Sequence, residues 1–300
     1  MNHRYEYVVL DVFTTTPFKG NPLAVIPEAE GLSGVEMQTI AREFNLSETV
    51  FLMPPERAGA AVRARIFTPQ RELPFAGHPT IGAAAVFCAR SGTPPPFSIE
   101  EHVGPVRIDA GADGGKNGLL WLTTPPVTFY ETLDVEFCAS LLGLNANDVR
   151  TDAIPCFASA GSPLLFVCLE SADAVDCAQL QQQYLPGALG SADSVGTFVF
   201  ARKSRNSRSD FDVYSRMFAP QTGIPEDPAT GGATGPLAAY MMRYGLLPDS
   251  EPAAFVSEQG TKMGRQSFLH VQTDPATGTI KVGGSTVTIA HGVLEIAATG

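Results

Sequence analysis

Residues 67–82 read FTPQRELPFAGHPTIG, and residues 218–237 read FAPQTGIPEDPATGGATGPL. Each stretch begins with an F-x-P-Q motif. A turn follows, and a glycine then begins an apolar segment. Upstream of each, GNPL at 20–23 matches GSPL at 161–164. The matching segments keep their order at an offset of about 150 residues, far longer than a solenoid period. Chance similarity of four-letter words is the alternative, but order, offset and context favour a duplication into two similar domains.

The composition limits the class of protein. The chain has 300 residues, of which 44% are hydrophobic and 17% charged, so it can bury a sizeable core. At about 150 residues per domain, this length predicts two domains. The formal net charge of −11 argues against a nucleic-acid partner, because such binders usually carry a basic face. With 29 glycines and 24 prolines, we expect many tight turns and short strands.

The sequence gives no sign of a membrane partner or of export. Residues 1–10 include Arg4 and Glu6 and lack the apolar core of a signal peptide. The longest apolar stretch, Ile81–Ala89, is far shorter than the roughly 20 residues that span a bilayer. The five cysteines show no paired spacing, as is typical of reduced thiols. We therefore expect a cytoplasmic protein.

Two small-residue-rich segments predict the central helices of the two domains. His78–Arg90 is apolar nearly all round, a pattern typical of a buried helix. Gly232–Tyr244 has the same character, and Gly245 is well placed to end it. Earlier in the chain, Ser33 and Glu36 have the spacing of a capping box at the start of a further helix.

A proline pair, Pro125-Pro126, is the best candidate for a linker. We therefore expect an N-terminal domain over residues 1–126 and a C-terminal domain over residues 127–300. The glycine-rich segment 111–118 is predicted to form a turn, and the polar segment 204–209 an exposed loop.

The glycine-led helix starts suggest a binding site for an anion. A helix N-terminus presents unpaired amides and the positive end of the helix dipole, and glycine lets a ligand approach the backbone closely. Two such helices, one in each domain, could hold one small carboxylate. The other interpretation is that these glycines only let helices pack closely against strands. The residues alone leave both interpretations open.

Ten short motifs, spread over nearly the whole chain, closely resemble the PhzF family of phenazine-biosynthesis-like isomerases. They are DVFT (11–14), PF (17–18), GNPLAV (20–25), NLSET (45–49), FTP (67–69), PFAGHPT (74–80), EDPATG (226–231), EQG (258–260), MGR (263–265) and VGG (282–284). The resemblance implies an α+β fold of two pseudo-symmetric domains. Each domain would be a β-barrel-like sheet wrapped around a central helix, as in diaminopimelate epimerase. It also implies a ligand site between the domains and a homodimer, and relatives of this fold suggest that a strand near residues 293–296 returns to the first domain.

The resemblance assigns catalytic roles to three residues. Glu48, in the NLSET motif, would be the general acid/base that moves a proton between substrate carbons. A carboxylate in a poorly hydrated cleft has a raised pKa and can both accept and return a proton. His78 would contact polar groups of the substrate and help to relay a proton. Asp227 would face an amino or hydroxyl group of the substrate, although it could also serve as a turn or capping residue before Pro228.

Substrate binding is assigned to Asn21 and to residues at the two helix starts, namely Gly77, Pro79, Thr80, Gly232, Ala233 and Thr234. One position departs from the family pattern. Where the phenazine enzyme carries serine, this chain has Gly232. A lost hydrogen bond to a buried polar group costs on the order of 1–3 kcal/mol. The phenazine substrate is therefore not assigned from the sequence.

The expected activity is that of a cofactor-independent isomerase acting on a small carboxylate. Racemases of this fold use two thiols, one at each helix start, but Gly77 and Gly232 occupy those positions. The sequence shows no phosphate-binding loop and no metal-ligand spacing of histidines and cysteines. We therefore expect no cofactor and no metal. The alternatives are a non-catalytic carboxylate-binding protein on the same fold and a related lyase or tautomerase.

Overall fold

The computed structural model describes residues 3–111, 118–188, 190, 194–202, 212–247, 253–274 and 276–296. The chain forms two compact units, which we call unit 1 (residues 1–123 and 283–300) and unit 2 (residues 124–282). These limits differ from the expected boundary after Pro126 by a few residues. The segment from Gly283 onward belongs to unit 1. Most of the predicted turn over 111–118 and of the predicted loop over 204–209 lies outside the described residues.

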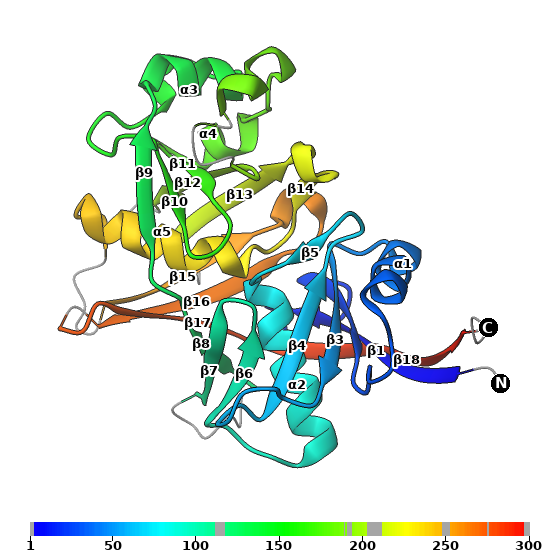
Figure 1. Cartoon of the computed structure of the whole chain (residues 1–300). Helices are drawn as coiled ribbons and strands as arrows, with labels where there is room; N and C mark the ends of the chain where they lie inside the picture. Colours follow the sequence, from blue (N-terminus) through cyan, green and yellow to red (C-terminus); the bar gives the residue numbers. More distant parts are fainter. Residues whose placement is uncertain are drawn as a thin grey trace. The chain divides into compact units, whose positions relative to one another are not determined.

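Unit 1 is built on one sheet with two helices (Figure 1). Its elements are β1 (His3–Val12), β2 (Asn21–Ile26), α1 (Gly34–Phe44), β3 (Glu48–Met53), β4 (Val62–Phe67), β5 (Glu72–Leu73), α2 (Gly77–Ser91), β6 (Phe97–Glu101), β7 (Gly104–Ala110), β8 (Leu120–Thr123) and β18 (Thr286–Ile296). The strands are ordered β18–β1–β2–β3–β4–β6–β7–β8, and β5 pairs with the end of β4. The pairs β2–β3 and β4–β6 are parallel, and the other pairs in this order are antiparallel.

Helix α2 lies at the centre of unit 1, as its apolar sequence predicts. It contacts β1, β2, β3, β4, β8 and β18, so strands from both ends of the sheet order surround it. The small residues of α2 permit this close packing. At Gly82, an added Cβ would lie 2.3 Å from Cδ2 of Leu23 on β2. The sheet is therefore wrapped around the helix, and the start of α2 is held in a fixed place relative to β2 and β3.

Helix α1 leads the chain towards Glu48, the predicted general acid/base. The predicted capping box is confirmed, because Ser33 accepts from the amide of Glu36 and Glu36 accepts from the amide of Ser33. The helix ends at Asn45, whose φ of 50° lies in the left-handed region. After this turn the chain enters β3 at Glu48.

Unit 2 repeats the plan of unit 1 with added helices on the outer face of its sheet. Its elements are β9 (Thr128–Thr132), α3 (Val135–Leu142), η1 (Ala146–Asp148), β10 (Cys156–Ser159), β11 (Leu164–Leu169), α4 (Ala172–Cys177), η2 (Gln182–Ala188), β12 (Thr197–Arg202), β13 (Val213–Ala219), η3 (Pro220–Thr222), β14 (Ile224–Asp227), α5 (Gly231–Arg243), β15 (Ala253–Gln259), η4 (Thr261–Met263), β16 (Ser267–Asp274) and β17 (Thr279–Gly284). The order is β9–β10–β11–β12–β13–β15–β16. Helix α5 packs against β10, β11 and β16. Its residue Tyr240 is the largest fully buried side chain in the core between the helix and the sheet.

The duplication is visible in the strand pairing of the two units. In unit 2, β11–β12 and β13–β15 are parallel, as β2–β3 and β4–β6 are in unit 1. The motif GSPL leads into β11, as GNPL leads into β2. The motif FAPQ lies at the end of β13, as FTPQ lies at the end of β4. Helix α5 thus corresponds to α2.

The structure corrects the alignment of the two helix starts by one residue. Gly77 and Gly231 are the first residues of α2 and α5, so Gly231, and not Gly232, corresponds to Gly77. The fourth residue of each helix confirms this register, because both Thr80 and Thr234 donate to the carbonyl four residues earlier. In this register, Gly232 corresponds to His78.

Candidate active site

Unit 1 brings three of the predicted site residues into contact. Glu48 is the first residue of β3, His78 the second of α2, and Asn21 the first of β2. Nε2 of His78 lies 3.3 Å from Oε2 of Glu48. On the other side of the ring, Nδ1 of His78 lies 3.2 Å from Nδ2 of Asn21. Segments far apart in the sequence thus place an amide, an imidazole and a carboxylate next to one another.

Burial makes His78 a neutral hydrogen-bonding group. Its side chain is 4% exposed, and desolvation lowers its pKa to about 3. At neutral pH the contact with Glu48 is therefore not an ion pair. Because the amide nitrogen of Asn21 can only donate, Nδ1 of His78 accepts, and the ring proton stands on Nε2. Nε2 lies close to the carboxylate of Glu48, whose side chain is 12% exposed, but His78 Nε2 and Glu48 Oε2 are not aligned for a hydrogen bond.

The start of α2 lacks a capping side chain. Its N-cap residue, Ala76, has an extended backbone and no side-chain hydrogen bond. Gly77 and His78 supply backbone amides in the first turn, whereas Pro79 has none. The hydroxyl of Thr80 points inward, to the carbonyl of Ala76 and to Glu101. Backbone amides, and not side chains, are therefore the groups that this turn can offer to an anion.

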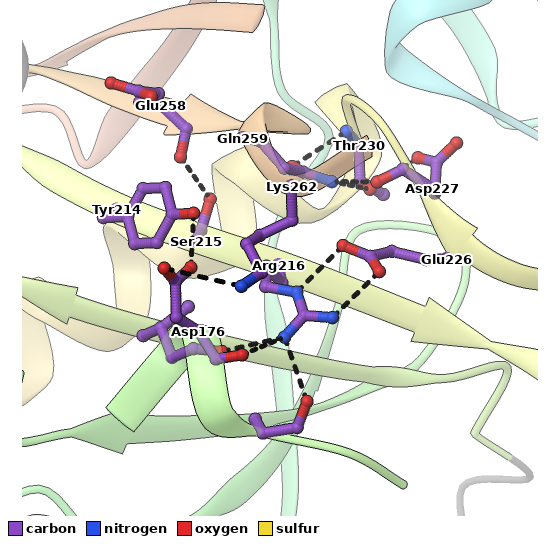
Figure 2. A network of polar contacts seen from close by, with 12 residues as sticks. Asp176, Tyr214, Ser215, Arg216, Glu226, Asp227, Thr230, Glu258, Gln259 and Lys262 are labelled. Atoms are coloured by element: carbon purple, nitrogen blue, oxygen red, sulfur yellow. Dashed lines mark hydrogen bonds and ion pairs between the residues drawn. The ribbon is translucent and has the colours of Figure 1, made fainter. Parts of the chain in front are cut away.

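Unit 2 places Asp227 beside the start of α5. Asp227 ends β14 and is 7% exposed, and its Oδ2 accepts from the hydroxyl of Thr230 at 2.6 Å. Gln259 braces this turn from β15: its Nε2 donates to the carbonyl of Asp227 at 2.8 Å and to the Thr230 hydroxyl at 2.9 Å. Its Oε1 accepts from the amide of Thr230 at 3.1 Å. Figure 2 shows Gln259, Thr230 and Asp227 in this arrangement.

A buried arginine fixes the residue next to Asp227. Arg216 on β13 makes a two-point contact with Glu226, at 2.9 and 3.0 Å. Nη1 of Arg216 also donates to the carbonyls of Val175, Asp176 and Ala178 at the end of α4 (Figure 2). A guanidinium so placed complements the negative end of a helix and holds a carboxylate in one orientation.

The remaining predicted residues of unit 2 lie in the first turn of α5. Gly232 is partly exposed, whereas Ala233 and Thr234 are buried. As at α2, no side chain caps the helix start. The turn is packed tightly from β15, because Gly260, with φ of 77°, has its missing Cβ only 2.5 Å from the carbonyl of Pro228. Only glycine fits there.

Three residues with clear structural roles were not singled out from the sequence, namely Glu101, Arg216 and Gln259. Gln259 was quoted only as part of the EQG motif. The signal available for Arg216 was its place in the otherwise apolar and small strand segment VYSRMFA, where a charged residue calls for a buried partner.

The fold defines a class of protein built from two similar units, each with a helix inside a sheet. Solved epimerase structures share this fold. A hydroxyproline epimerase from Agrobacterium vitis superposes with a TM-score of 0.63 over 97% of this chain and 92% of its own, at 12% identity. The predicted epimerase of Pseudomonas aeruginosa gives a TM-score of 0.80 at 31% identity, over 99% of this chain and 100% of its own. The α+β, diaminopimelate epimerase-like fold predicted from the sequence is confirmed.

The family follows from the sequence comparison. The family described as "Phenazine biosynthesis-like protein" matches residues 10–292. The trans-2,3-dihydro-3-hydroxyanthranilate isomerase of Pseudomonas aeruginosa is 34% identical, over 96% of this chain and 98% of its own length. The chain therefore belongs to the phenazine biosynthesis-like family of isomerases, as its motifs predicted. Across the described residues, no helix combines the length and the apolar character needed to cross a membrane.

Proposed function

We propose that this protein is a cofactor-independent isomerase in which Glu48 moves a proton between two carbons of a small carboxylate substrate. The observation that carries this proposal is the close approach of Asn21, His78 and Glu48, with the buried His78 ring between the other two side chains. It sets one carboxylate in a mostly dry site beside a neutral N–H donor. A group so placed can take a proton from carbon and return it.

The proposed reaction uses Glu48 twice. The ionised carboxylate removes a proton from one substrate carbon, and the electron pair of that C–H bond delocalises towards the substrate's own carboxylate. Amides at the helix start stabilise the developing negative charge. The carboxylic acid thus formed on Glu48, whose proton exchanges with solvent, then delivers a proton to a second carbon, which restores the catalyst and moves the double bond.

Trans-2,3-dihydro-3-hydroxyanthranilate is the first substrate to test, because a relative is named for acting on it. The absence of a hydroxyl at Gly232 favours a different pattern of polar groups on the true substrate, or binding through backbone amides alone. We propose that Asp227 contacts an amino or hydroxyl group of the substrate. A panel of small amino and hydroxy carboxylates, screened by thermal shift, would identify the ligand. A ligand at 100 times its Kd adds roughly 2.7 kcal/mol to stability.

Deuterium uptake from D₂O tests the role of Glu48. The wild type should exchange protons at carbon in the bound substrate, whereas Glu48→Gln should bind the same ligand with an unchanged fold and exchange none. Glu56→Gln is the matched control, since Glu56 is an exposed glutamate of the same unit. Full exchange in Glu48→Gln would refute the role of Glu48.

The same experiment separates the two alternatives. Ligand binding without any exchange in the wild type would favour a non-catalytic binding protein. Release of a leaving group after proton removal would instead indicate a lyase. The homodimer and the cytoplasmic location also stay predictions, which sedimentation and cell fractionation can test.

A further inference from the structure

Glu101, the last residue of β6, is a buried carboxyl group that the proposed reaction does not use. The residue is 3% exposed. Its Oε1 lies 2.6 Å from the hydroxyl of Thr80, in the first turn of α2. Its Oε2 is also buried and has no hydrogen-bond partner among the residues that the structure describes. An ionised oxygen in that position would pay a large desolvation cost.

The contacts of Thr80 indicate which partner supplies the proton. The Thr80 hydroxyl lies 2.7 Å from the carbonyl oxygen of Ala76, which can only accept. A hydroxyl has a single proton, so it cannot donate to Ala76 and to Glu101 at once. If Glu101 is protonated, it donates to Thr80 and Thr80 donates to Ala76. Both short contacts are then hydrogen bonds.

In unit 2, the position that corresponds to Glu101 is occupied by a neutral side chain, that of Gln259. In the parallel pairs, Glu100 lies opposite Arg63, and Glu258 lies opposite Tyr214. Because FTPQ and FAPQ align Arg63 with Tyr214, Glu101 and Gln259 occupy equivalent positions. Gln259 is a permanently neutral residue that holds the turn before α5 through three hydrogen bonds.

Among the residues that the structure describes, no cationic side chain forms an ion pair with Glu101. On β6, Glu100 accepts from the amides of Glu56 and Arg57 and lies 3.7 Å from the Arg57 side chain. On β7, the residues opposite this end of β6 are Gly104 and Pro105, which carry no charge.

The other titratable groups nearby do not compensate for a charge on Glu101 either. His102, the next residue, is half exposed and lies 3.7 Å from Glu72. In the first turn of α2 the one titratable side chain is His78, which is neutral. Burial raises the pKa of Glu101 to about 8, and the contact with Thr80 offsets this only in part.

We propose that Glu101 is a positioning residue that holds the first turn of α2 as a neutral carboxylic acid. This inference rests on the proposed function of that turn as an anion-binding helix start. A neutral Glu101 supports the turn without placing a negative charge beneath the amides that receive the substrate carboxylate. When Glu101 ionises at alkaline pH, its charge opposes the incoming anion and weakens binding.

Carbon-13 NMR of protein labelled at the glutamate carboxyl carbons tests the protonation state without any need for activity. Comparison with Glu101→Gln assigns the Glu101 signal. We expect this signal to titrate near pH 8, well above the ordinary range of glutamate. Titration in the ordinary range would overturn the proposal, whatever the protein's activity. Glu100→Gln is the matched control: burial acts to raise the pKa of Glu100, but the amides of Arg57 and Glu56 and the charges of Arg63 and Arg57 together lower it.

Kinetics then test the consequence for binding. For the carboxylate substrate identified by the screen, KM of the wild type should rise by about two- to fivefold as pH passes through 8, the scale of one charge at a helix terminus. Glu101→Gln should abolish that rise while kcat stays close to that of the wild type. Glu101→Leu, which removes the hydrogen bond, should lower kcat. An unchanged rise of KM in Glu101→Gln would overturn the proposal, whereas a loss of turnover in every protein would refute only the proposed function.

Discussion

The first turns of α2 and α5 have the same framework but carry different chemistry. Each helix begins at a glycine and has a threonine whose hydroxyl bonds to the N-cap carbonyl. Each unit also has an arginine that makes a two-point contact with a glutamate on the next strand. Arg65 on β4 contacts Glu72 on β5, and Arg216 on β13 contacts Glu226 on β14. The framework is therefore structural, and it was retained in both units after the duplication.

The three side chains that approach one another in unit 1 have no counterparts of the same kind at the corresponding described positions of unit 2. His78 corresponds to Gly232, and Asn21 corresponds to Ser162 through GNPL and GSPL. The strand register aligns Glu48 with Gly196. Unit 2 in turn has Asp227 where unit 1 has Leu73. This difference agrees with the proposed function, in which one base, Glu48, moves the proton and Asp227 makes a polar contact. Two opposed bases would require matching groups in both units.

The largest effect is expected on replacing the imidazole that distinguishes the two helix starts. His78→Ala should lower kcat by about 10²–10³, the usual cost of losing one preorganised donor in a closed site. Deuterium uptake into the bound substrate measures this. His102→Ala is the control, since His102 is half exposed and bonds to neither Glu48 nor Asn21 in the described structure. An unaltered rate in His78→Ala would mean that Glu48 needs no orienting partner.

The two arginine pairs should differ in energy because they differ in burial. Arg216 is 10% exposed and binds three carbonyls as well as Glu226, whereas Arg65 is 20% exposed and contacts Glu72. Arg216→Met should therefore cost about 2–4 kcal/mol, since it strands a mostly buried carboxylate. Arg65→Met should cost about 1 kcal/mol.

Urea unfolding measures both arginine variants. The double variant Arg216→Met with Glu226→Gln should recover part of the loss, because it removes the stranded charge as well. Equal costs for the two single variants would show that the units do not differ in this respect.

Patterns within single segments made much of the fold predictable. The central helices were predicted because their residues are small and apolar on nearly every side. The short strands β5, β10 and β14 were not predicted, since so few residues show no periodicity. Their places are set by pairing with strands distant in the sequence.

The site was predictable only where a motif marked it. Glu48 and His78 were selected by resemblance, and the structure shows that they touch. Glu101 was missed because EEH at 100–102 reads as a solvated charge run, and only tertiary packing buries its second glutamate. Burial of a single polar side chain is a property of its neighbours in space, which the local sequence does not encode.

The pH dependence of stability should distinguish Glu101 from its neutral counterpart. The pKa of Glu101 is about 8 in the folded chain, against an ordinary value of 4.5. Between these values the folded state binds the proton more tightly than the unfolded state, so this stabilisation is full below pH 4.5 and is lost as pH rises through 8. The slope is roughly 1.4 kcal/mol per pH unit.

Urea unfolding at a series of pH values measures this slope. Glu101→Gln should flatten the curve relative to the wild type over this range. Gln259→Ala lowers stability by removing hydrogen bonds but should leave the slope as it is. Parallel curves for wild type and Glu101→Gln would show that Glu101 does not take up its proton on folding.

The smallest effect concerns the two threonines that both helix starts share. Thr234→Val removes one hydrogen bond, to the carbonyl of Thr230, and should cost about 0.5–1.5 kcal/mol, because valine keeps the shape of threonine. Thr80→Val removes the same bond and also deprives the buried carboxyl of Glu101 of its partner, so it should cost about 1–2 kcal/mol more. Thermal unfolding of the two variants measures the difference. Equal losses would mean that the contact between Thr80 and Glu101 contributes no net stability. The two helix starts would then differ in the side chains of their first turns, and not in the stability that the contacts of Thr80 and Thr234 provide.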